Sequence, residues 1–283
     1  MNKLTLKIAL ITLLLLAAVS AQATLKLHSL FTDHMVLQRD IPVPVWGWAD
    51  PGEEVTVKLA GQLVAATTGD DGKWKVMLQP LQVAESLNLT VKGKGETLIV
   101  MDVAVGEVWL ASGQSNMSFP LSSDINYQKA LETATDPGLR LFSSPGVVSY
   151  TLLEDVKSKW VAATSAPNTV GRFSATGYYF GRELRKSLKV PVGIIQAAVG
   201  GVPGSAYFSP EAMEASTDPG LKISAANYRR NREIVIPWMN TVLAKYKVDL
   251  AEAQKNKTPL PKYPADIIPL PFDPNKPCLL YNG

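Results

Sequence analysis

Histidine and cysteine are scarce in this chain of 283 residues. It has two histidines, His28 and His34, and one cysteine, Cys278. A single cysteine cannot form a disulfide within the chain, and Cys278 has no cysteine or histidine neighbour with which to bind a metal ion. We therefore expect no disulfide framework, no metal and no cofactor.

A strong excess of one charge is also missing. The formal net charge is +3 at pH 7, and no basic patch stands out. Two of the lysines, Lys3 and Lys7, lie in a leader that we expect to be removed, which leaves a nearly neutral protein. Nucleic-acid binding normally needs a basic surface, so we expect no nucleic-acid partner. Hydrophobic residues make up 46% of the chain, which is enough for one large domain or two of ordinary size.

An apolar stretch at residues 8–18 is too short to span a bilayer comfortably. Lysines precede it and Ala-Gln-Ala follows at 21–23, so residues 1–23 have the three parts of a secretory signal peptide. We predict cleavage before Thr24, and a retained membrane anchor is the alternative. The expected location is the bacterial periplasm or the medium, with no stable membrane insertion after cleavage.

Residues 24–102 alternate short apolar runs with turns, which predicts a small all-β sandwich domain. The runs expected to form strands are 42–48, 54–59, 63–67, 73–78 and 87–92. Trp46, Trp48 and Trp74 lie in these runs. We interpret them as core residues rather than as sugar-stacking platforms, because small sandwiches bury tryptophan routinely. His34, next to apolar residues, is likewise interpreted as structural.

The pattern changes after Asp102. The near-continuous apolar run 103–110 is typical of a strand buried on both faces of an α/β sheet. Residues 177–188 have helical spacing, and 192–198 predict a second parallel strand, placed beside the first by a right-handed crossover. The two strands should therefore end at the same edge of the sheet.

A serine follows the first of these strands. Residues 111–117 read Ala-Ser-Gly-Gln-Ser-Asn-Met, and a tight turn there would expose the Ser115 hydroxyl at the carboxyl edge of the sheet. The alternative is a polar turn that only caps a helix, since serine and asparagine are common in both settings. No histidine follows Ser115 in the sequence, although a serine hydrolase needs a base.

Several segments together resemble one family. The motif Gly-Gln-Ser-Asn-Met at 113–117 resembles the first block of the SGNH hydrolases, in particular of the sialate O-acetylesterase-like branch of the carbohydrate esterases. Residues 30–39 and 44–52 are similar to the amino-terminal signature of that branch. Residues 173–184 and 192–201 are similar to its next two signatures.

The resemblance implies an SGNH-hydrolase-like α/β domain with a flavodoxin-like parallel sheet, and it assigns roles to particular residues. Ser115 would be the nucleophile. The amides of Ser115 and of Gly200 or Gly201 would hold the oxyanion. Gln114 and Asn116 would belong to the same oxyanion and substrate-binding set.

Two parts of the family pattern have no match in this sequence. One is the third block, whose asparagine completes the oxyanion hole, and the other is the final Asp-x-x-His, which supplies acid and base. Val199 and Ser118 also replace a usual Trp and a usual Glu. We therefore expect residues 103–283 to be the amino-terminal part of an SGNH hydrolase domain, incomplete because the chain is carboxy-terminally truncated. The alternative is a truncated but folded chain in which His28 or His34 serves as the base.

The remaining segments carry weaker patterns. Residues 136–138 and 218–220, both Asp-Pro-Gly, are predicted turns. Residues 227–255 are predicted to form a helical insertion that packs over the site, and the proline-rich run 259–277 is predicted to be an extended wrap.

The predicted function is that of a serine esterase that removes O-acetyl groups from sialic acid or related sugars through an acyl-enzyme, with an O-acetylated carbohydrate as substrate. Without the catalytic Asp and His portion, the truncated chain is expected to be inactive. The alternatives are an acetylxylan esterase of the same superfamily and a non-catalytic carbohydrate-binding or structural module.

Overall fold

The computed structural model describes residues 25–146, 153–166 and 168–262. The predicted signal peptide, Cys278 and most of the predicted proline-rich wrap lie outside the described residues. The chain divides into two compact units, one up to Glu107 and one from Val108 onward, hereafter the amino-terminal unit and the Ser115 unit. The predicted division between residues 102 and 103 stays a prediction.

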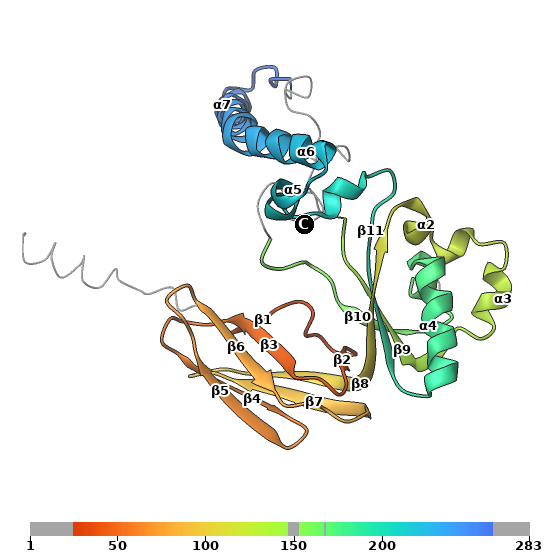
Figure 1. The fold of residues 1–283 in the computed structure, drawn as a ribbon. Helices are drawn as coiled ribbons and strands as arrows, with labels where there is room; N and C mark the ends of the chain where they lie inside the picture. Colours follow the sequence, from red (N-terminus) through yellow and green to blue (C-terminus); the bar gives the residue numbers. More distant parts are fainter. Residues whose placement is uncertain (1–24, 147–152, 167, 263–283) are drawn as a thin grey trace, which may run out of the picture. The chain divides into compact units, whose positions relative to one another are not determined.

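The amino-terminal unit is built of β-strands (Figure 1). One sheet has the order β1-β3-β6, and the other strands pair in the order β8-β7-β4-β5, with β2 on β8. The strands are β1 (Lys26–Leu27), β2 (Val36–Gln38), β3 (Val43–Trp48), β4 (Glu54–Leu59), β5 (Gln62–Thr67), β6 (Lys73–Leu78), β7 (Ala84–Lys92) and β8 (Thr97–Gly113). All five strands predicted before residue 102 are present, whereas the short strands β1 and β2 were not predicted.

Alternation along the strands decides which side chains enter the core of this unit. In β4 and β6 every second residue is buried, and Trp74 is only 2% exposed. Trp46 and Trp48 are half-buried on the other face of β3, where the Phe31 ring meets Trp46 edge-on at 4.7 Å. The core interpretation is therefore confirmed for Trp74, whereas Trp46 and Trp48 keep part of their surface exposed.

His34 makes a contact compatible with the structural role predicted for it, but it is not buried in the core. Its side chain is 47% exposed, and its Nδ1 lies 2.6 Å from Oδ2 of Asp102. The backbone turns at His34, with a φ of 68°, so the ring leaves the core while Met35 and Val36 stay buried. An apolar sequence context therefore did not imply a buried ring.

The Ser115 unit contains the end of β8 and three further strands in its described part. These strands are β9 (Asp136–Ser143), β10 (Trp160–Ala163) and β11 (Val192–Ala198), in the order β10-β9-β11-β8. Strand β11 runs parallel to β9 and β10 runs antiparallel to it, so the sheet is mixed rather than purely parallel. A mixed sheet with helices is compatible with an α/β hydrolase.

Two strand predictions need correction here. Residues 136–138 were predicted to be a turn, but they begin β9, where the Asp136 carboxylate accepts a hydrogen bond from the Gly138 amide at 2.8 Å. Strand β9 was not predicted because Arg140, a charged residue that is buried here, interrupts its apolar run. In β8, residues 103–106 are buried as predicted, but Trp109 and Leu110 are exposed.

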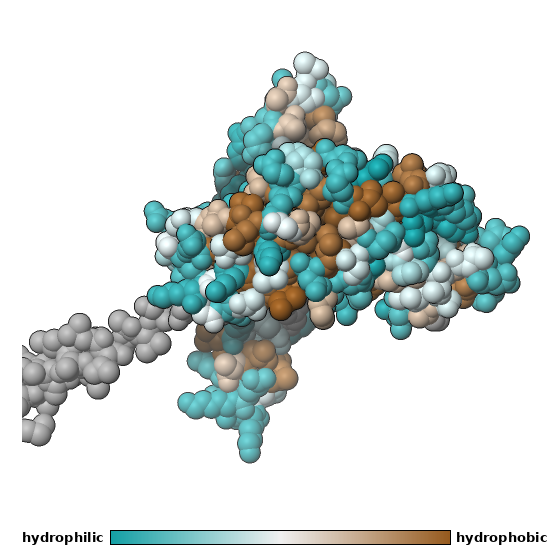
Figure 2. Space-filling view, turned by 90° about the horizontal axis from the view of Figure 1, so that it is seen from below, coloured by the Kyte–Doolittle hydropathy of each residue, from teal (hydrophilic) through white to brown (hydrophobic). Residues whose placement is uncertain are grey.

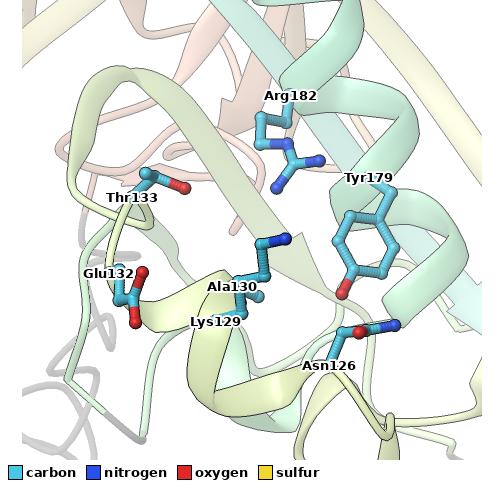
Figure 3. Close-up of a pocket in the computed structure, with 7 residues that line it drawn as sticks. All are labelled: Asn126, Lys129, Ala130, Glu132, Thr133, Tyr179 and Arg182. Carbon is cyan, nitrogen blue, oxygen red and sulfur yellow. The ribbon is translucent and has the colours of Figure 1, made fainter.

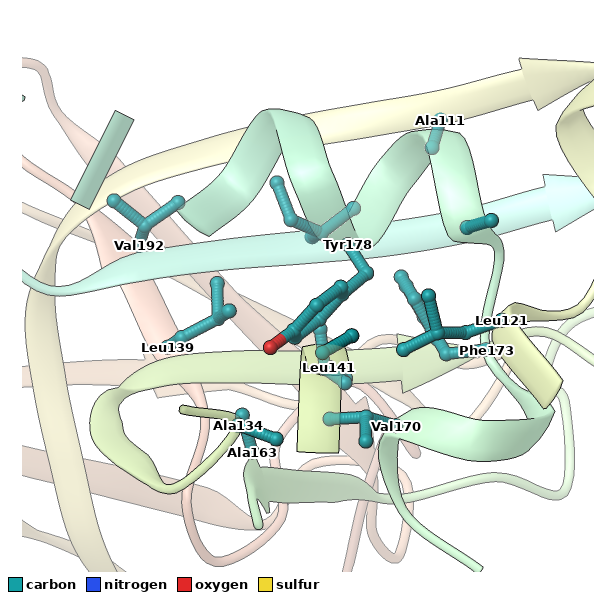
Figure 4. Close-up of a cluster of buried hydrophobic side chains, with 13 residues drawn as sticks. Ala111, Leu121, Ala134, Leu139, Leu141, Ala163, Val170, Phe173, Tyr178 and Val192 are labelled. Atoms are coloured by element: carbon teal, nitrogen blue, oxygen red, sulfur yellow. The ribbon is translucent and has the colours of Figure 1, made fainter. Parts of the chain in front are cut away.

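Helix α4 packs against this sheet. The helices before β11 are α2 (Ser115–Ser118), α3 (Tyr127–Leu131) and α4 (Ala175–Leu188). Ser174 caps α4 by accepting a hydrogen bond from the Gly177 amide, and Tyr178 reaches from α4 toward Leu139 and Leu141 of β9 (Figure 4). A Cβ on Gly181 would lie 2.8 Å from Ile194 Cγ1, so the glycine allows the close approach of helix and sheet.

The carboxy-terminal helices differ from the predicted ones. They are α5 (Pro210–Ala215), α6 (Pro219–Arg230) and α7 (Ile236–Asn256), with a π-helical stretch at Asn231–Val235. Residues 218–220 are not a turn, because Asp218 caps α6 and Pro219 opens it, so the helical region begins eight residues before the predicted start at residue 227. Helices α5 and α6 bury Met213, Ala225 and Tyr228 between them. That this region covers the site stays a prediction.

Hydrophobic side chains are exposed in both units. The face drawn in Figure 2 shows hydrophobic residues among hydrophilic ones, and exposed examples include Leu63 and Ile223. Surface hydrophobic residues of this kind are common in globular proteins and do not by themselves mark an interface. Within the residues described, no helix is both long and apolar enough to cross a membrane.

Candidate active site around Ser115

The end of β8 presents Ser115 at the surface. The strand ends at Gly113, whose φ of +142° is rarely adopted by residues with a side chain. Ser115 is the first residue of α2 and its side chain is exposed. The residue before it, Gln114, makes no side-chain capping bond to α2. The amides at the start of α2 are therefore not occupied by a cap.

Gly200 lies beside Ser115, on the loop that follows β11. A Cβ placed on Gly200 would be 3.6 Å from Cα of Ser115 and 3.7 Å from its Cβ. Gly201 has a φ of +79°, and a Cβ there would meet no atom within 4 Å. The structure therefore brings Gly200 against the serine, while Gly201 serves the turn. This agrees with the expectation that both strands end at one edge of the sheet.

Tyr207 joins the two loops and was missed as a site residue by the sequence reading. Its hydroxyl donates to the carbonyl oxygen of Gly113 at 2.5 Å and accepts from the amide of Val199 at 3.2 Å. The Val199 amide also contacts the Gly113 carbonyl at 3.2 Å. The signals in the sequence were its place shortly after a glycine-rich turn and its departure from the family pattern at that position. Tyr207 thus holds the Ser115 turn to the Gly200 turn.

Gln114 belongs to the same link. Its side-chain amide donates a hydrogen bond to the carbonyl oxygen of Val202. The structure therefore places Gln114 between the two loops, where it positions the Ser115 turn. Its predicted part in binding substrate stays a prediction.

The start of α4 supports α2 from the other side. The Thr176 hydroxyl donates to the carbonyl oxygen of Asn116 at 3.4 Å, and the Ser174 hydroxyl lies 3.4 Å from the sulfur of Met117. The Ser174 amide donates to the side-chain oxygen of Gln196 on β11 at 2.8 Å. The serine turn is therefore held by α4 and β11 together, and the Asn116 side chain remains exposed.

Two backbone amides without a partner among the described residues belong to residues that lie against each other, Ser115 and Gly200. Within the described part of the chain, the amides of Ser115 and Gly200 have no hydrogen-bond partner. Amides left open beside a serine can stabilise negative charge that develops on a carbonyl oxygen. The arrangement can therefore hold an oxyanion next to a hydroxyl nucleophile.

Neither histidine belongs to the Ser115 unit. His34 pairs with Asp102, and Nδ1 of His28 accepts a hydrogen bond from the Leu30 amide at 3.1 Å, both within the amino-terminal unit. Among the described residues, no group of three or more His, Cys, Asp or Glu side chains is placed to bind a metal ion.

Comparison with known proteins points to one group of enzymes. No family model matches the chain. It is 32% identical over 239 residues to a sialate O-acetylesterase of Rattus norvegicus and 32% identical over 225 residues to that of Homo sapiens. The matches cover 76% and 73% of this chain but 43% of each relative, so the chain spans less than half the length of the curated relatives it matches.

A solved structure agrees with these sequence matches. A carbohydrate acetylesterase from Xanthomonas citri is 37% identical, with a TM-score of 0.65 over 68% of this chain and 44% of that one. The structural likeness supports the α/β hydrolase fold class and the sequence likeness supports common descent. By this homology the chain belongs to the sialate O-acetylesterase-like carbohydrate acetylesterases.

Proposed function

We propose that Ser115 is the nucleophile of a carbohydrate O-acetylesterase. The observation that carries the proposal is the contact between Ser115 and Gly200, with an open amide on each residue. The relatives are sialate O-acetylesterases and a carbohydrate acetylesterase, which favours an O-acetylated sugar as the substrate. Sialic acid or a related sugar is the proposed acetyl carrier.

In the proposed reaction, the Ser115 oxygen attacks the acetyl carbonyl carbon while a base takes its proton. The C–O bond to the sugar then breaks, the sugar oxygen receives that proton and leaves as a hydroxyl, and an acetyl-serine remains. Water then attacks the acetyl-serine and releases acetate. The carbonyl oxygen becomes negative in both steps, and the amides of Ser115 and Gly200 stabilise it. Gly200 is preferred to Gly201 as the second donor because Gly200 lies against the serine.

The proton of Ser115 needs an acceptor. Residues 103–283 contain no histidine. We propose that in the whole protein the base and its carboxylate partner come from outside these residues, and that the present chain has little esterase activity by itself. Removing a member of a serine triad leaves only about 10³- to 10⁴-fold acceleration over water, and here the base is absent.

Chemical rescue tests this proposal. Purified protein is incubated with p-nitrophenyl acetate with and without imidazole, and acetylation is located by peptide mass spectrometry. Imidazole supplies the missing base, so it should raise acetylation at Ser115 and ester hydrolysis above the rates of a Ser115→Ala variant. The matched control is Ser122→Ala, which removes an exposed hydroxyl from the neighbouring 3-10 helix at Leu121–Ser123 and should keep the rescue. Equal rates in the wild type and Ser115→Ala would reject the nucleophile.

The finer substrate and the alternatives can be separated in the same assay. An acetylxylan esterase would deacetylate acetylated xylan faster than O-acetylated sialic acid. A carbohydrate-binding or structural module would show no acetylation of Ser115, and the half-buried Trp46 and Trp48 are the observation that favours it. In that alternative the two sheets of the amino-terminal unit, which we propose to form a sandwich, would be the working part.

The location of the protein follows the same proposal. Because residues 1–23 have the three parts of a secretory signal peptide, we propose a periplasmic or secreted esterase from which this segment is cleaved. Amino-terminal sequencing of exported protein should begin at Thr24. Finding Met1 on membrane-bound protein would contradict this.

A further inference from the structure

A cavity of about 400 Å³ lies beside α3 and α4 in the Ser115 unit (Figure 3). This volume is within the range of small-molecule sites, which hold ligands of monosaccharide size and larger. Its lining residues are Asn126, Lys129, Ala130, Glu132, Thr133, Tyr179 and Arg182. Arg182 lies six residues beyond Thr176, which contacts α2, and so about 9 Å further along the α4 axis. Neither Ser115 nor any other residue of α2 lines the cavity, so it is separate from the serine.

Two cations converge on this cavity. Figure 3 shows the Lys129 ammonium and the Arg182 guanidinium pointing toward the same space, which the Glu132 carboxylate also lines. Lys129 has no hydrogen bond or ion pair with any residue that the structure describes. Two positive charges in one cavity repel each other, which raises the free energy of the empty site. An anion bound between them offsets this repulsion.

The neighbouring carboxylate does not fully compensate Arg182. The Arg182 side chain is 26% exposed and its guanidinium lies 3.1 Å from Glu183. The same Glu183 oxygen also accepts a hydrogen bond from Lys186 at 3.0 Å. One exposed carboxylate is thus shared by two cations, which leaves Arg182 able to bind a further anion.

The rest of the lining offers groups that suit a sugar. Asn126 contributes an amide and Thr133 a hydroxyl, and the Tyr179 ring lies 4.9 Å from the Arg182 guanidinium. Burial and a hydrogen bond with Asp124 raise the pKa of Tyr179, so its hydroxyl stays neutral at physiological pH. Neutral donors and acceptors beside an aromatic ring match the hydroxyl groups and apolar face of a sugar ring.

We propose that this cavity binds a monosaccharide that carries a carboxylate, with the carboxylate between Lys129 and Arg182 and the ring hydroxyls near Asn126 and Thr133. The inference goes beyond the proposed esterase activity, because it requires neither Ser115 nor hydrolysis. It adds an accessory site for acidic sugars to the unit that holds the serine.

The test is a ligand titration of the purified protein followed by NMR or calorimetry. The probe is N-acetylneuraminate, and its methyl ester is the matched ligand without charge. The acid should bind and the ester should bind at least about tenfold more weakly, the size expected for one charge-assisted contact. Equal binding of acid and ester, or tighter binding of inorganic phosphate than of the acid, would overturn the proposal.

Variants locate the site. Lys129→Met keeps an unbranched side chain, one atom shorter and without charge, and should weaken binding of the acid about tenfold. Arg182→Gln should do the same. Lys222→Met removes an exposed lysine from α6 and should leave binding unchanged. Ser115→Ala should also leave binding unchanged, so a failure of the esterase proposal can be told apart from a failure of this one. Unchanged affinity in folded Lys129→Met protein would reject the site.

Discussion

One strand pair from each unit shows the difference between local and distant pairing, although each unit contains both parallel and antiparallel pairs. In the amino-terminal unit, β4 and β5 form an antiparallel hairpin through a tight turn at Ala60 and Gly61. In the Ser115 unit, β11 pairs with β9 in parallel, although β10 and α4 lie between them in the sequence. A hairpin such as β4–β5 can be predicted from two neighbouring apolar runs and the turn between them. A pair such as β9–β11 depends on contacts between segments that are distant in the sequence. The difference shows which parts of such a chain can be predicted from short-range patterns.

Removing a large core side chain from each unit should have the largest effect. Trp74→Ala and Phe173→Ala should each lower the free energy of unfolding by about 3–5 kcal/mol, because both side chains are almost fully buried. Hydrogen exchange measured by mass spectrometry in increasing urea would follow both units at once. Each substitution should increase exchange mainly in its own unit. An equal increase in hydrogen exchange in both units would show that they unfold together, which would contradict their treatment as two units.

Substitutions at two closely packed glycines, one in each unit, should lower the free energy of unfolding by less than the core substitutions do, and by different amounts in the two units. A Cβ on Gly47 would lie 1.9 Å from the backbone oxygen of Lys26, so Gly47→Ala should disrupt the pairing of β1 with β3 and cost about 1–3 kcal/mol. At Gly181 the nearest atoms belong to side chains that can move, and alanine favours the helix by about 1 kcal/mol. Gly181→Ala should therefore cost less. The control is Gly95→Ala, which meets no atom within 4 Å. A larger loss at Gly181 than at Gly47, measured by urea unfolding, would contradict this order.

Tyr207→Phe tests the link between the loops of the candidate site. The substitution removes the hydrogen bonds to Gly113 and Val199 and should cost about 1 kcal/mol. Exchange of the amides near Ser115 should increase while the amino-terminal unit is unchanged. Protection equal to that of the wild type would mean that the link contributes little.

Tyr178→Phe should have the smallest effect at neutral pH. The hydroxyl is buried and has no hydrogen-bond partner among the residues that the structure describes, so its removal should change stability by no more than about 0.5 kcal/mol. Burial raises the pKa of Tyr178 above its usual value near 10, which means that the folded state favours the neutral form. The wild type should therefore keep this stability below pH 10 and lose it as the pH rises through the raised pKa. Tyr178→Phe should not lose stability in this way above pH 10. Parallel curves of unfolding free energy against pH for the wild type and the variant would show that the Tyr178 pKa is not raised by folding.

The sequence predicted most of the amino-terminal unit because its strands obey a simple rule. In β4 and β6, buried and exposed positions alternate, and apolar and polar residues alternate with them in the sequence. The rule failed where single residues break the pattern. Arg140 concealed β9, and the positive φ at His34 turned a ring out of an apolar segment.

The candidate site could be predicted only in part. The position of Ser115 after a strand and the glycine turn after β11 were both predicted, because strand order fixes which ends share a sheet edge. The choice between Gly200 and Gly201 needed coordinates, since it depends on which glycine faces the serine. The parts played by Tyr207 and Gln114 also needed coordinates, because each joins loops that are far apart in the sequence.

Strand β8 has a consequence for dividing this protein by genetic engineering. Its early residues pair with β7, residues 104–106 pair with β2, and its last residue precedes the serine turn. A fragment that stops at Asp102 would leave β2 without its partner, and a fragment that starts at Val108 would begin in the middle of a strand. Because both units use β8, a cut inside this strand removes strand pairing from at least one of them. Recombination between relatives should therefore succeed when β8 comes whole from one parent, with the crossover before Thr97 or after Gly113.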